Sequence, residues 1–506
     1  MESGATGRVA KNTVMLYFRQ IVILAVGLYT VRVILSALGA EDYGIYNVVA
    51  GIVTMFNFLS VSMAATSQRF FSYDLGRQDY ESLRTTFAIT FEMYVLLAVL
   101  VVVLAETVGL WFVNHKLVIP SGRMRASNTV YQLSIISFVL TFLSAPFLAL
   151  IISHEEMAVY ACVSSIEAVL KLLAVLLLKF ISFDKLVLYA MLLCIVAAAV
   201  ALIYTVFCHV RYSESRVRLC WDTKRFAEIT GFSGWCLFGT VAGIAKNQVT
   251  NVLLNLFFGP IVNAARGIAF NVNAAVSSFA NNFNMALRPQ IVKTYSSGNR
   301  EDALHLTYWM SKLTYFMLFV FMLPVWLEME YVLGLWLGSV PEYTAVFTRL
   351  ILIEVLTDSF SLGLQSLSQA TGKMRLYQSV VGGMLLFNLP VSFVLLKSGF
   401  SQYSVQVAAI AIGLLAFVLR LLIVRVLTGL SVRTYARVTI FPCFLVSLTS
   451  CAVPFLVHRN MQEGLLRFFL VVTMSLLCVA LLGFALGLSR KERKQMCAFV
   501  VKRLSR

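Results

Sequence analysis

Long apolar stretches follow one another along nearly the whole of this 506-residue chain, and they constrain its fold more than any other feature. About fourteen of them are each about 20 residues long, the length that a helix needs to cross the hydrocarbon layer of a bilayer. A soluble protein needs about 25% charged residues to cover its surface, whereas only 13% of this chain is charged. The sequence therefore predicts an all-α, polytopic membrane protein.

The segments between the stretches are short, so no region is long enough to fold as a soluble domain. Whatever the protein does, it does inside or across the membrane. With ends uncertain by about four residues, the predicted spans are 14–36, 44–66, 86–112, 129–152, 157–179, 186–208, 230–257, 262–287, 303–327, 343–369, 375–396, 404–427, 437–457 and 465–488.

Three short motifs recur at an offset of about 220 residues, which indicates a parallel internal repeat of six spans. They are Leu38-Gly39 with Phe258-Gly259, Gln68-Arg69 with Pro289-Gln290, and the turn 75–79 with the turn 297–301. We expect two six-helix lobes that face a central cavity, where the cargo site of such repeats lies. The predicted division is 1–215 for the N-terminal lobe, 216–430 for the C-terminal lobe, and 431–506 for two extra helices and a basic cytoplasmic tail.

The formal net charge of +17 follows membrane topology, so nucleic-acid binding is not expected. With both termini in the cytoplasm, about 25 Lys and Arg side chains fall on the cytoplasmic side and about 8 on the other side. The segment 113–128 is the weakest point of this topology, because Lys116, Arg123 and Arg125 fall on the wrong side.

Several cations lie within the predicted spans: Arg19, Arg32, Lys171, Lys246, Arg266, Lys312, Arg349 and Arg420. A charge at membrane depth is costly, so its presence suggests a water-filled path and an anionic cargo. For Arg19, Arg32, Lys312 and Arg349, which lie nearer to span ends, snorkelling to the interface is an equally good explanation.

Amide side chains follow two of these cations. Asn247, Asn251 and Asn255 continue one helix face after Lys246, and Asn273, Ser277, Asn281 and Asn284 do so after Arg266. Such stripes suit a wet surface that binds sugar. Hydrogen bonding between helices is the alternative, because Asn also supplies it in membranes.

The acidic residues are few. Glu167 and Lys171 are spaced to neutralise each other on one helix face. Glu354 and Asp358 share a face with like charge, which makes them candidates for ion coupling, and Glu92 is a third. A salt bridge from this pair to Arg349 or Arg420 is the alternative.

No catalytic grouping is present. The five histidines are dispersed, and the sequence lacks metalloprotease, serine-hydrolase and phosphate-loop motifs. The nine cysteines include no C-x-x-C, and those within spans are interpreted as small core residues. We expect no enzyme activity, no cofactor and no metal site.

Specific motifs resemble a known family. They are Asn12-Thr13 with Leu16-Tyr17 and Arg19, the run Asp42-Tyr43-Gly44-Ile45-Tyr46-Asn47-Val48-Val49, Gln68-Arg69-Phe70, 245–249, 263–269 and 288–293. Over roughly residues 10 to 430 the chain resembles Wzx-type polysaccharide flippases of the multidrug/oligosaccharidyl-lipid/polysaccharide (MOP) superfamily, which is related to MATE transporters and MurJ-type lipid II flippases.

The resemblance implies a fourteen-helix, two-lobed protein of the bacterial inner membrane. Such a flippase moves polyprenyl-diphosphate-linked oligosaccharide outward by alternating access, for surface polysaccharide (O-antigen, capsule or exopolysaccharide) biosynthesis. Arg266 fits the cationic lumen best, Lys246 second and Arg19 third, with the amides Asn247, Asn251 and Asn273. Membrane lipids and polysaccharide polymerase or assembly proteins are the expected partners.

Two rival functions stay open. One is a MATE-like H+- or Na+-coupled multidrug or cation antiporter, although basic residues dominate these spans. The other is a membrane polymerase or ligase for the same glycan, although no large external loop is visible.

Overall fold

The computed structural model describes residues 3–115, 117, 119–178, 180, 183–216, 222–337, 340–489 and 492–493, and this part of the chain is helical with short connections. Nine of its helices are long and apolar enough to cross a membrane, or ten if the bent pair Gly44–Thr54 and Asn57–Gly76 forms one span. The prediction of an all-α, multi-pass membrane protein is confirmed.

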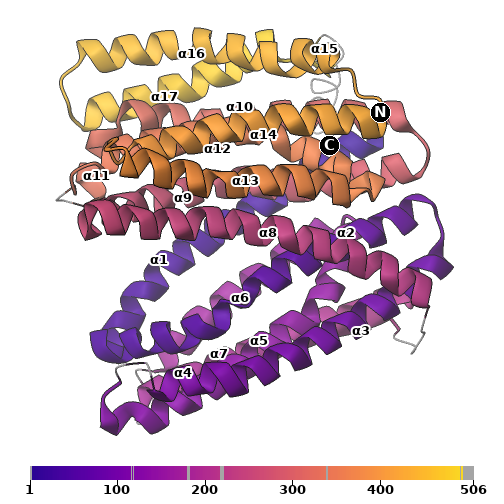
Figure 1. Cartoon of the computed structure of the whole chain (residues 1–506), viewed down its shortest axis with the longest axis vertical. Helices are drawn as coiled ribbons and strands as arrows, with labels where there is room; N and C mark the ends of the chain where they lie inside the picture. Colours follow the sequence, from indigo (N-terminus) through magenta and orange to yellow (C-terminus); the bar gives the residue numbers. More distant parts are fainter. Residues whose placement is uncertain are drawn as a thin grey trace. The chain divides into compact units, whose positions relative to one another are not determined.

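Contacts divide the chain into two compact units. The N-terminal unit, Asn12–Leu237, has a central helix, α5, that packs against α2, α3, α6 and α7 around a core containing Phe71, Phe87 and Phe147. Its helices, coloured indigo to magenta in Figure 1, are α1 (Ser3–Thr54), α2 (Asn57–Gly76), α3 (Tyr80–Leu104), α4 (Leu110–His115), α5 (Met124–Ser153), α6 (Met157–Leu177) and α7 (Lys185–Arg211).

The first helix differs from the prediction. Spans 14–36 and 44–66 were expected with a loop between them, but α1 is helical from Ser3 to Thr54 and the break falls at 55–56, with a bend of 44°. Asp42, which lies between the two predicted spans, is part of this continuous helix and accepts a 2.6 Å hydrogen bond from Arg123.

One turn geometry occurs twice. Gln78 and Gly298, 220 positions apart, both have a left-handed backbone, with φ of 58° and 88°. The next residues, Asp79 and Asn299, cap the following helices by accepting from the amide nitrogens of Ser82 and Asp302. The predicted repeat therefore has a local structural counterpart.

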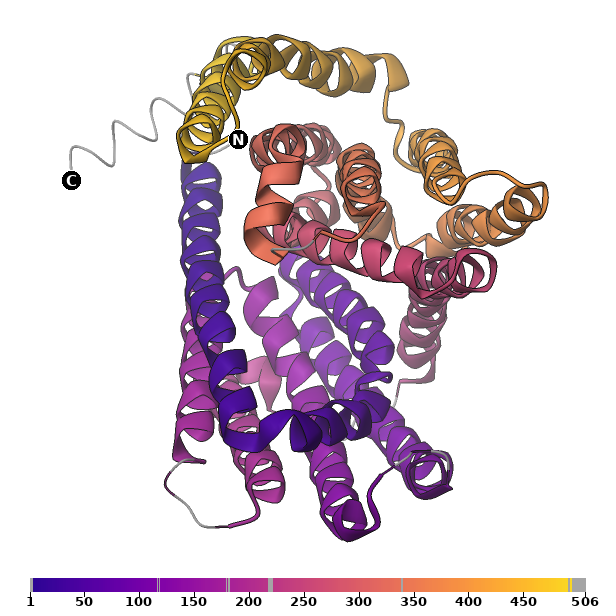
Figure 2. The ribbon, with the colours of Figure 1, turned by 90° about the vertical axis from the view of Figure 1, so that its left-hand side faces the viewer.

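The C-terminal unit comprises Phe238 onward together with Met1–Lys11, so the boundary between the units lies within α8; the predicted division at 215/216 stays a prediction. In this unit α12 packs against α9, α10 and α14, while α16 and α17 lie side by side (Figure 2, yellow) and both contact α10. The helices are α8 (Thr223–Phe258), α9 (Pro260–Ser296), α10 (Arg300–Leu327), α11 (Met329–Leu337), α12 (Thr344–Thr371), α13 (Met374–Lys397), α14 (Ser404–Thr428), α15 (Val432–Tyr435), α16 (Phe441–Asn460) and α17 (Leu465–Leu482).

A glycine allows the close approach of α10 and α12. A Cβ built on Gly363 of α12 would lie 2.8 Å from the carbonyl oxygen of Thr307 on α10. Any larger residue would therefore push these two central helices apart.

Candidate functional site

A cavity of about 680 Å³ lies within the N-terminal unit. Five helices line it, each with residues three or four positions apart, so each helix presents one face to it. The lining residues are Arg19, Ile23, Val26 and Thr30 of α1, Asn57, Ser60, Val61 and Ala64 of α2, Thr141, Ser144, Ala145 and Leu148 of α5, Tyr160, Ser164, Glu167, Ala168 and Lys171 of α6, and Ala197, Val200 and Tyr204 of α7.

Arg19 is held against the cavity wall by Tyr160. Its guanidinium donates to the Tyr160 hydroxyl and lies 4.6 Å from the centre of that ring. A cation over an aromatic face is attracted by the ring quadrupole, so the side chain is positioned without being neutralised by this partner.

The other two charges of the cavity form an ion pair. Lys171 Nζ lies 2.6 Å from a carboxylate oxygen of Glu167, as the spacing predicted. The residues that line the cavity therefore include two cations and one carboxylate. Hydroxyl and amide groups are interspersed with aliphatic side chains on its walls.

The second predicted cation, Lys246, lies in the C-terminal unit and is paired. Its Nζ donates to Glu354 of α12, and the other carboxylate oxygen of Glu354 accepts from Gln406 of α14. The side chains of Lys246 and Glu354 are only 10% and 13% exposed. Lys246, predicted to bind an anion, and Glu354, predicted to couple an ion, thus form one ion pair.

Arg266 of α9 has no carboxylate partner among the ion pairs of the described residues. It donates to the side chain of Asn251 and to the carbonyl oxygen of Asn247, 3.4 Å away, and it stacks 4.5 Å from the Phe270 ring centre. The side chain is buried, and its Nε has no hydrogen-bond partner in the described part of the chain. Arg266 is therefore the cation of the C-terminal unit best suited to hold an anion.

The amide stripes include residues that link helices, and their role in binding sugar stays a prediction. Asn251 bonds to Arg266, and Asn284 accepts a 2.9 Å hydrogen bond from Thr314 of α10, so these two link helices. Ser277 donates within α9 to Asn273 over 2.6 Å. Three others, Asn247, Asn255 and Asn281, have exposed side chains.

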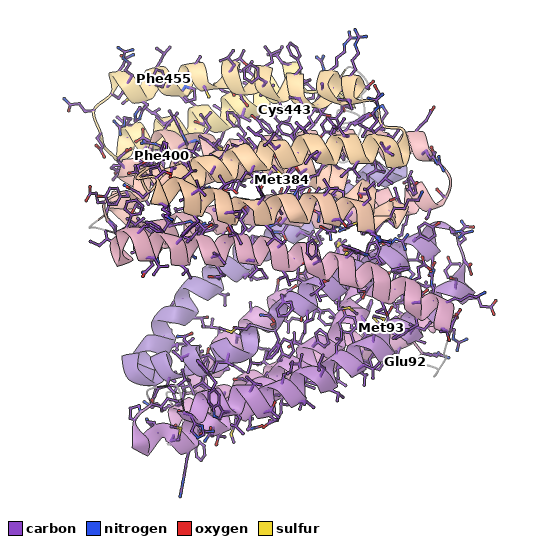
Figure 3. The ribbon with its side chains drawn as sticks, viewed as in Figure 1. Glu92, Met93, Met384, Phe400, Cys443 and Phe455 are labelled. Carbon is purple, nitrogen blue, oxygen red and sulfur yellow. The ribbon has the colours of Figure 1, made fainter. Side chains whose placement is uncertain are left out.

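The remaining acids and cations are distributed over both units. Asp358 lies within the electrostatic range of Arg420, Glu354 and Lys246, whereas Arg349 pairs with Glu330 at 2.8 Å. Arg349 thus pairs with Glu330 instead of the acidic pair, and the ion pairs of the described residues include none between Arg420 and Glu354 or Asp358. Glu92 lies on α3 (Figure 3). The Arg32 side chain lies outside the described residues.

Lys312 was predicted as a cation within a span, with snorkelling as the alternative. It is 1% exposed and donates to both carboxylate oxygens of Glu492, at 2.9 and 2.7 Å, instead of snorkelling. Burial alone would raise the pKa of Glu492, but hydrogen bonds from Lys312 and Ser489 and the Lys312 charge hold that pKa below its ordinary value. No local pattern signals a pair 180 positions apart.

No family model matches the chain. The "Uncharacterized membrane protein EpsK" of Bacillus subtilis (strain 168) is 20% identical over 276 residues, which is 54% of this chain and 54% of that protein. The chain thus spans about half the length of the curated relative that it matches.

Solved structures match over most of the chain. An outward-facing multidrug resistance MATE family transporter of the MOP superfamily has a TM-score of 0.72 at 11% identity, with 85% of this chain and 98% of that chain covered. A MOP superfamily transporter from Pyrococcus furiosus, described by a "reverse polarity of binding pocket", reaches 0.67 at 11%, with 85% and 98% covered. The MATE transporter ClbM in complex with Rb+ reaches 0.67 at 14%, with 84% and 96% covered.

At these identities the similarity establishes the fold. The chain has a MATE-like fold, and the solved structures named above are described as transporters.

Proposed function

We propose that this protein is a flippase that moves polyprenyl-diphosphate-linked oligosaccharide across the bacterial inner membrane for surface polysaccharide biosynthesis. The observation that carries the proposal is the N-terminal cavity, whose lining residues carry a net positive formal charge, with Arg19 in the wall beside hydroxyl groups on transmembrane helices. A guanidinium donates two parallel hydrogen bonds to phosphate oxygens, which suits a diphosphate better than a point charge does. The hydroxyl groups suit a glycan.

The proposal includes fourteen spans with both termini in the cytoplasm. Nine helices and the bent pair are long and apolar enough to cross a membrane. The remaining four spans would be the part of α1 before Gly44 and the more polar helices α8, α9 and α12, which are long enough to cross the hydrocarbon layer. Arg123 no longer weakens this topology, because Asp42 and Asp184 each lie 2.6 Å from its guanidinium and neutralise it.

Transport would proceed by alternating access. Arg266 is the second residue proposed to bind the diphosphate. Lys246 would have to separate from Glu354 before it could bind an anion. Glu354, Asp358 and Glu92 are the proposed ion-coupling acids, and polysaccharide polymerase or assembly proteins would take over the product.

The test replaces Arg19 with Ala and with Lys in cells that depend on this protein for surface polysaccharide. We expect Arg19→Ala to lower export at least tenfold at unchanged protein abundance, with lipid-linked oligosaccharide accumulating in the cytoplasmic leaflet, and Arg19→Lys to restore export partly. Arg349→Ala, which alters an ion pair with the 60%-exposed Glu330, is the matched control. Normal export in Arg19→Ala would show that transport does not depend on the cationic cavity. The same assay with Arg266→Ala tests the second cation.

A MATE-like antiporter is the second candidate, supported by the shared fold. The positive charge of the cavity disfavours a cationic drug. Drug efflux in Glu354→Gln and Asp358→Asn separates the two functions, because loss of resistance with intact glycan export would favour the antiporter.

A further inference from the structure

A second hollow of about 260 Å³ lies in the N-terminal unit between α2, α3 and the first turns of α8. Its walls are mainly hydrocarbon and thioether, and they include Met93 of α3, which is labelled in Figure 3. The Met93 sulfur lies against Thr230 of α8. The main apolar lining residues are Leu59, Met63, Met93, Leu96, Leu97 and Leu237.

Water is a poor occupant of this pocket, because a buried water needs two to four polar partners. Of the three lining hydroxyl groups, that of Ser62 donates to the Ser233 carbonyl oxygen at 3.4 Å and that of Thr230 contacts the Met93 sulfur at 4.0 Å. Apolar cavities of about 150 Å³ stay dry and take apolar molecules. Methionine side chains adapt to irregular hydrocarbon shapes, and on membrane-spanning helices the available hydrocarbon is a lipid chain.

The pocket and the cationic cavity share one helix. Asn57, Ser60 and Ala64 of α2 line the polar cavity, while Leu59 and Met63 of the same helix line the apolar pocket. A helix with its side chains is about 10–12 Å across. A molecule with a charged head and a hydrocarbon chain can therefore reach both hollows around α2.

We propose that the apolar pocket binds the isoprenoid chain of the passenger while the cationic cavity holds its diphosphate and sugars. This inference rests on the proposed function and adds a site for the lipid portion of the same molecule. The two hollows, which different residues of α2 line, suit a molecule with a large polar head and a long apolar chain, and the experiment below tests a phospholipid as the other occupant.

Gly234 and Gly231 of α8 give a matched pair of variants. A Cβ on either residue meets no atom within 4 Å, so neither position is closed to the start of a side chain, but only Gly234 lines the pocket. Gly234→Leu fills the pocket and Gly231→Leu leaves it open. Leu97→Phe fills it from α3 and serves if Gly234→Leu does not fold.

The experiment photolabels the full-length protein with geranylgeranyl diphosphate that carries a diazirine on its chain, in parallel with phosphatidylglycerol that carries it on an acyl chain. We expect the isoprenoid probe to label Met63, Met93 or Leu97, with labelling reduced at least fivefold in Gly234→Leu and unchanged in Gly231→Leu.

Three outcomes overturn the inference: no label in the pocket, undiminished labelling in the filled variants, or equal labelling by the phospholipid, which would mark an ordinary lipid site. Labelling is measured without transport, so it stands apart from the Arg19 export test. A failed export test with successful labelling would refute the flippase and keep the isoprenoid site.

Discussion

Lys246 on α8 and Glu354 on α12, 108 positions apart in the sequence, form a buried ion pair in the C-terminal unit. Because each residue is bound to the other, neither is free to bind an ion while the pair is intact. A phosphate that approaches Lys246 must compete with the Glu354 carboxylate, and a proton on Glu354 would release Lys246. We therefore expect anion binding and protonation to be linked at this pair.

Breaking the Lys246–Glu354 pair from one side is predicted to destabilise the protein. Lys246→Met leaves a carboxylate buried without its cation and should lower the free energy of unfolding by about 3–5 kcal/mol. The double variant Lys246→Met/Glu354→Gln should recover most of that loss, because neither charge remains. Thermal unfolding in detergent measures both. Lys171→Met, in a half-exposed pair, should cost less than about 1 kcal/mol; equal losses at the two lysines would contradict this.

Glu328 is predicted to fasten the last two long helices to α10. Its carboxylate is fully buried and bonds to His458 of α16 at 2.9 Å and to Arg467 of α17 at 2.7 Å. Glu328→Gln should cost about 3 kcal/mol and speed amide hydrogen exchange around His458 and Arg467.

Glu330→Gln is the control for Glu328→Gln. The Glu330 side chain is 60% exposed, so its loss should change stability by no more than about 1 kcal/mol. Unchanged exchange in Glu328→Gln would refute the fastening role.

The Glu492–Lys312 pair is predicted to weaken in acid. The folded pKa of Glu492 lies below its ordinary value of 4.5, so its contribution to stability is complete above about pH 4.5 and is lost as the pH falls through the lowered value. The unfolding midpoint of Glu492→Gln should lie below that of the unaltered protein at pH 7, and the gap should narrow as the pH falls below about 4.5. A gap that is constant with pH would disprove the linkage.

Apolar length and local spacing were enough to predict much of the fold. The predicted span 186–208 lies within α7, Lys185–Arg211, because an uninterrupted apolar stretch has few other stable conformations in a bilayer. The Glu167–Lys171 pair followed from helical spacing alone. The break at 55–56 was not predicted, since Asp42, between the two predicted spans, lies within a continuous helix and bonds to Arg123, 81 positions away.

The site was predicted less well, since its contacts join distant segments. The sequence identified Arg19, Lys246 and Arg266 as cations within spans, but it could not show which of them a carboxylate neutralises. The aromatic contact of Arg19 with Tyr160 spans 141 positions. The three- to four-residue spacing of small and polar residues on α1, α2, α5, α6 and α7 was a signal for the cavity, but such spacing equally fits helix packing.

The repeated turn supplies a final prediction. Gln78 adopts φ of 58°, where a side chain costs about 1–2 kcal/mol, whereas Gly298 adopts φ of 88° at the corresponding position without that cost. Gln78→Gly should therefore raise the free energy of unfolding by roughly 0.5–1 kcal/mol, after the entropy of an added glycine is subtracted. Gly298→Gln should lower it by a similar amount.

Arg77→Gly is the control for Gln78→Gly. Because φ of Arg77 is −86°, glycine relieves no strain there and should destabilise the protein by about 0.5–1 kcal/mol. If Gln78→Gly destabilised the protein as much as Arg77→Gly, the backbone at Gln78 would not be strained.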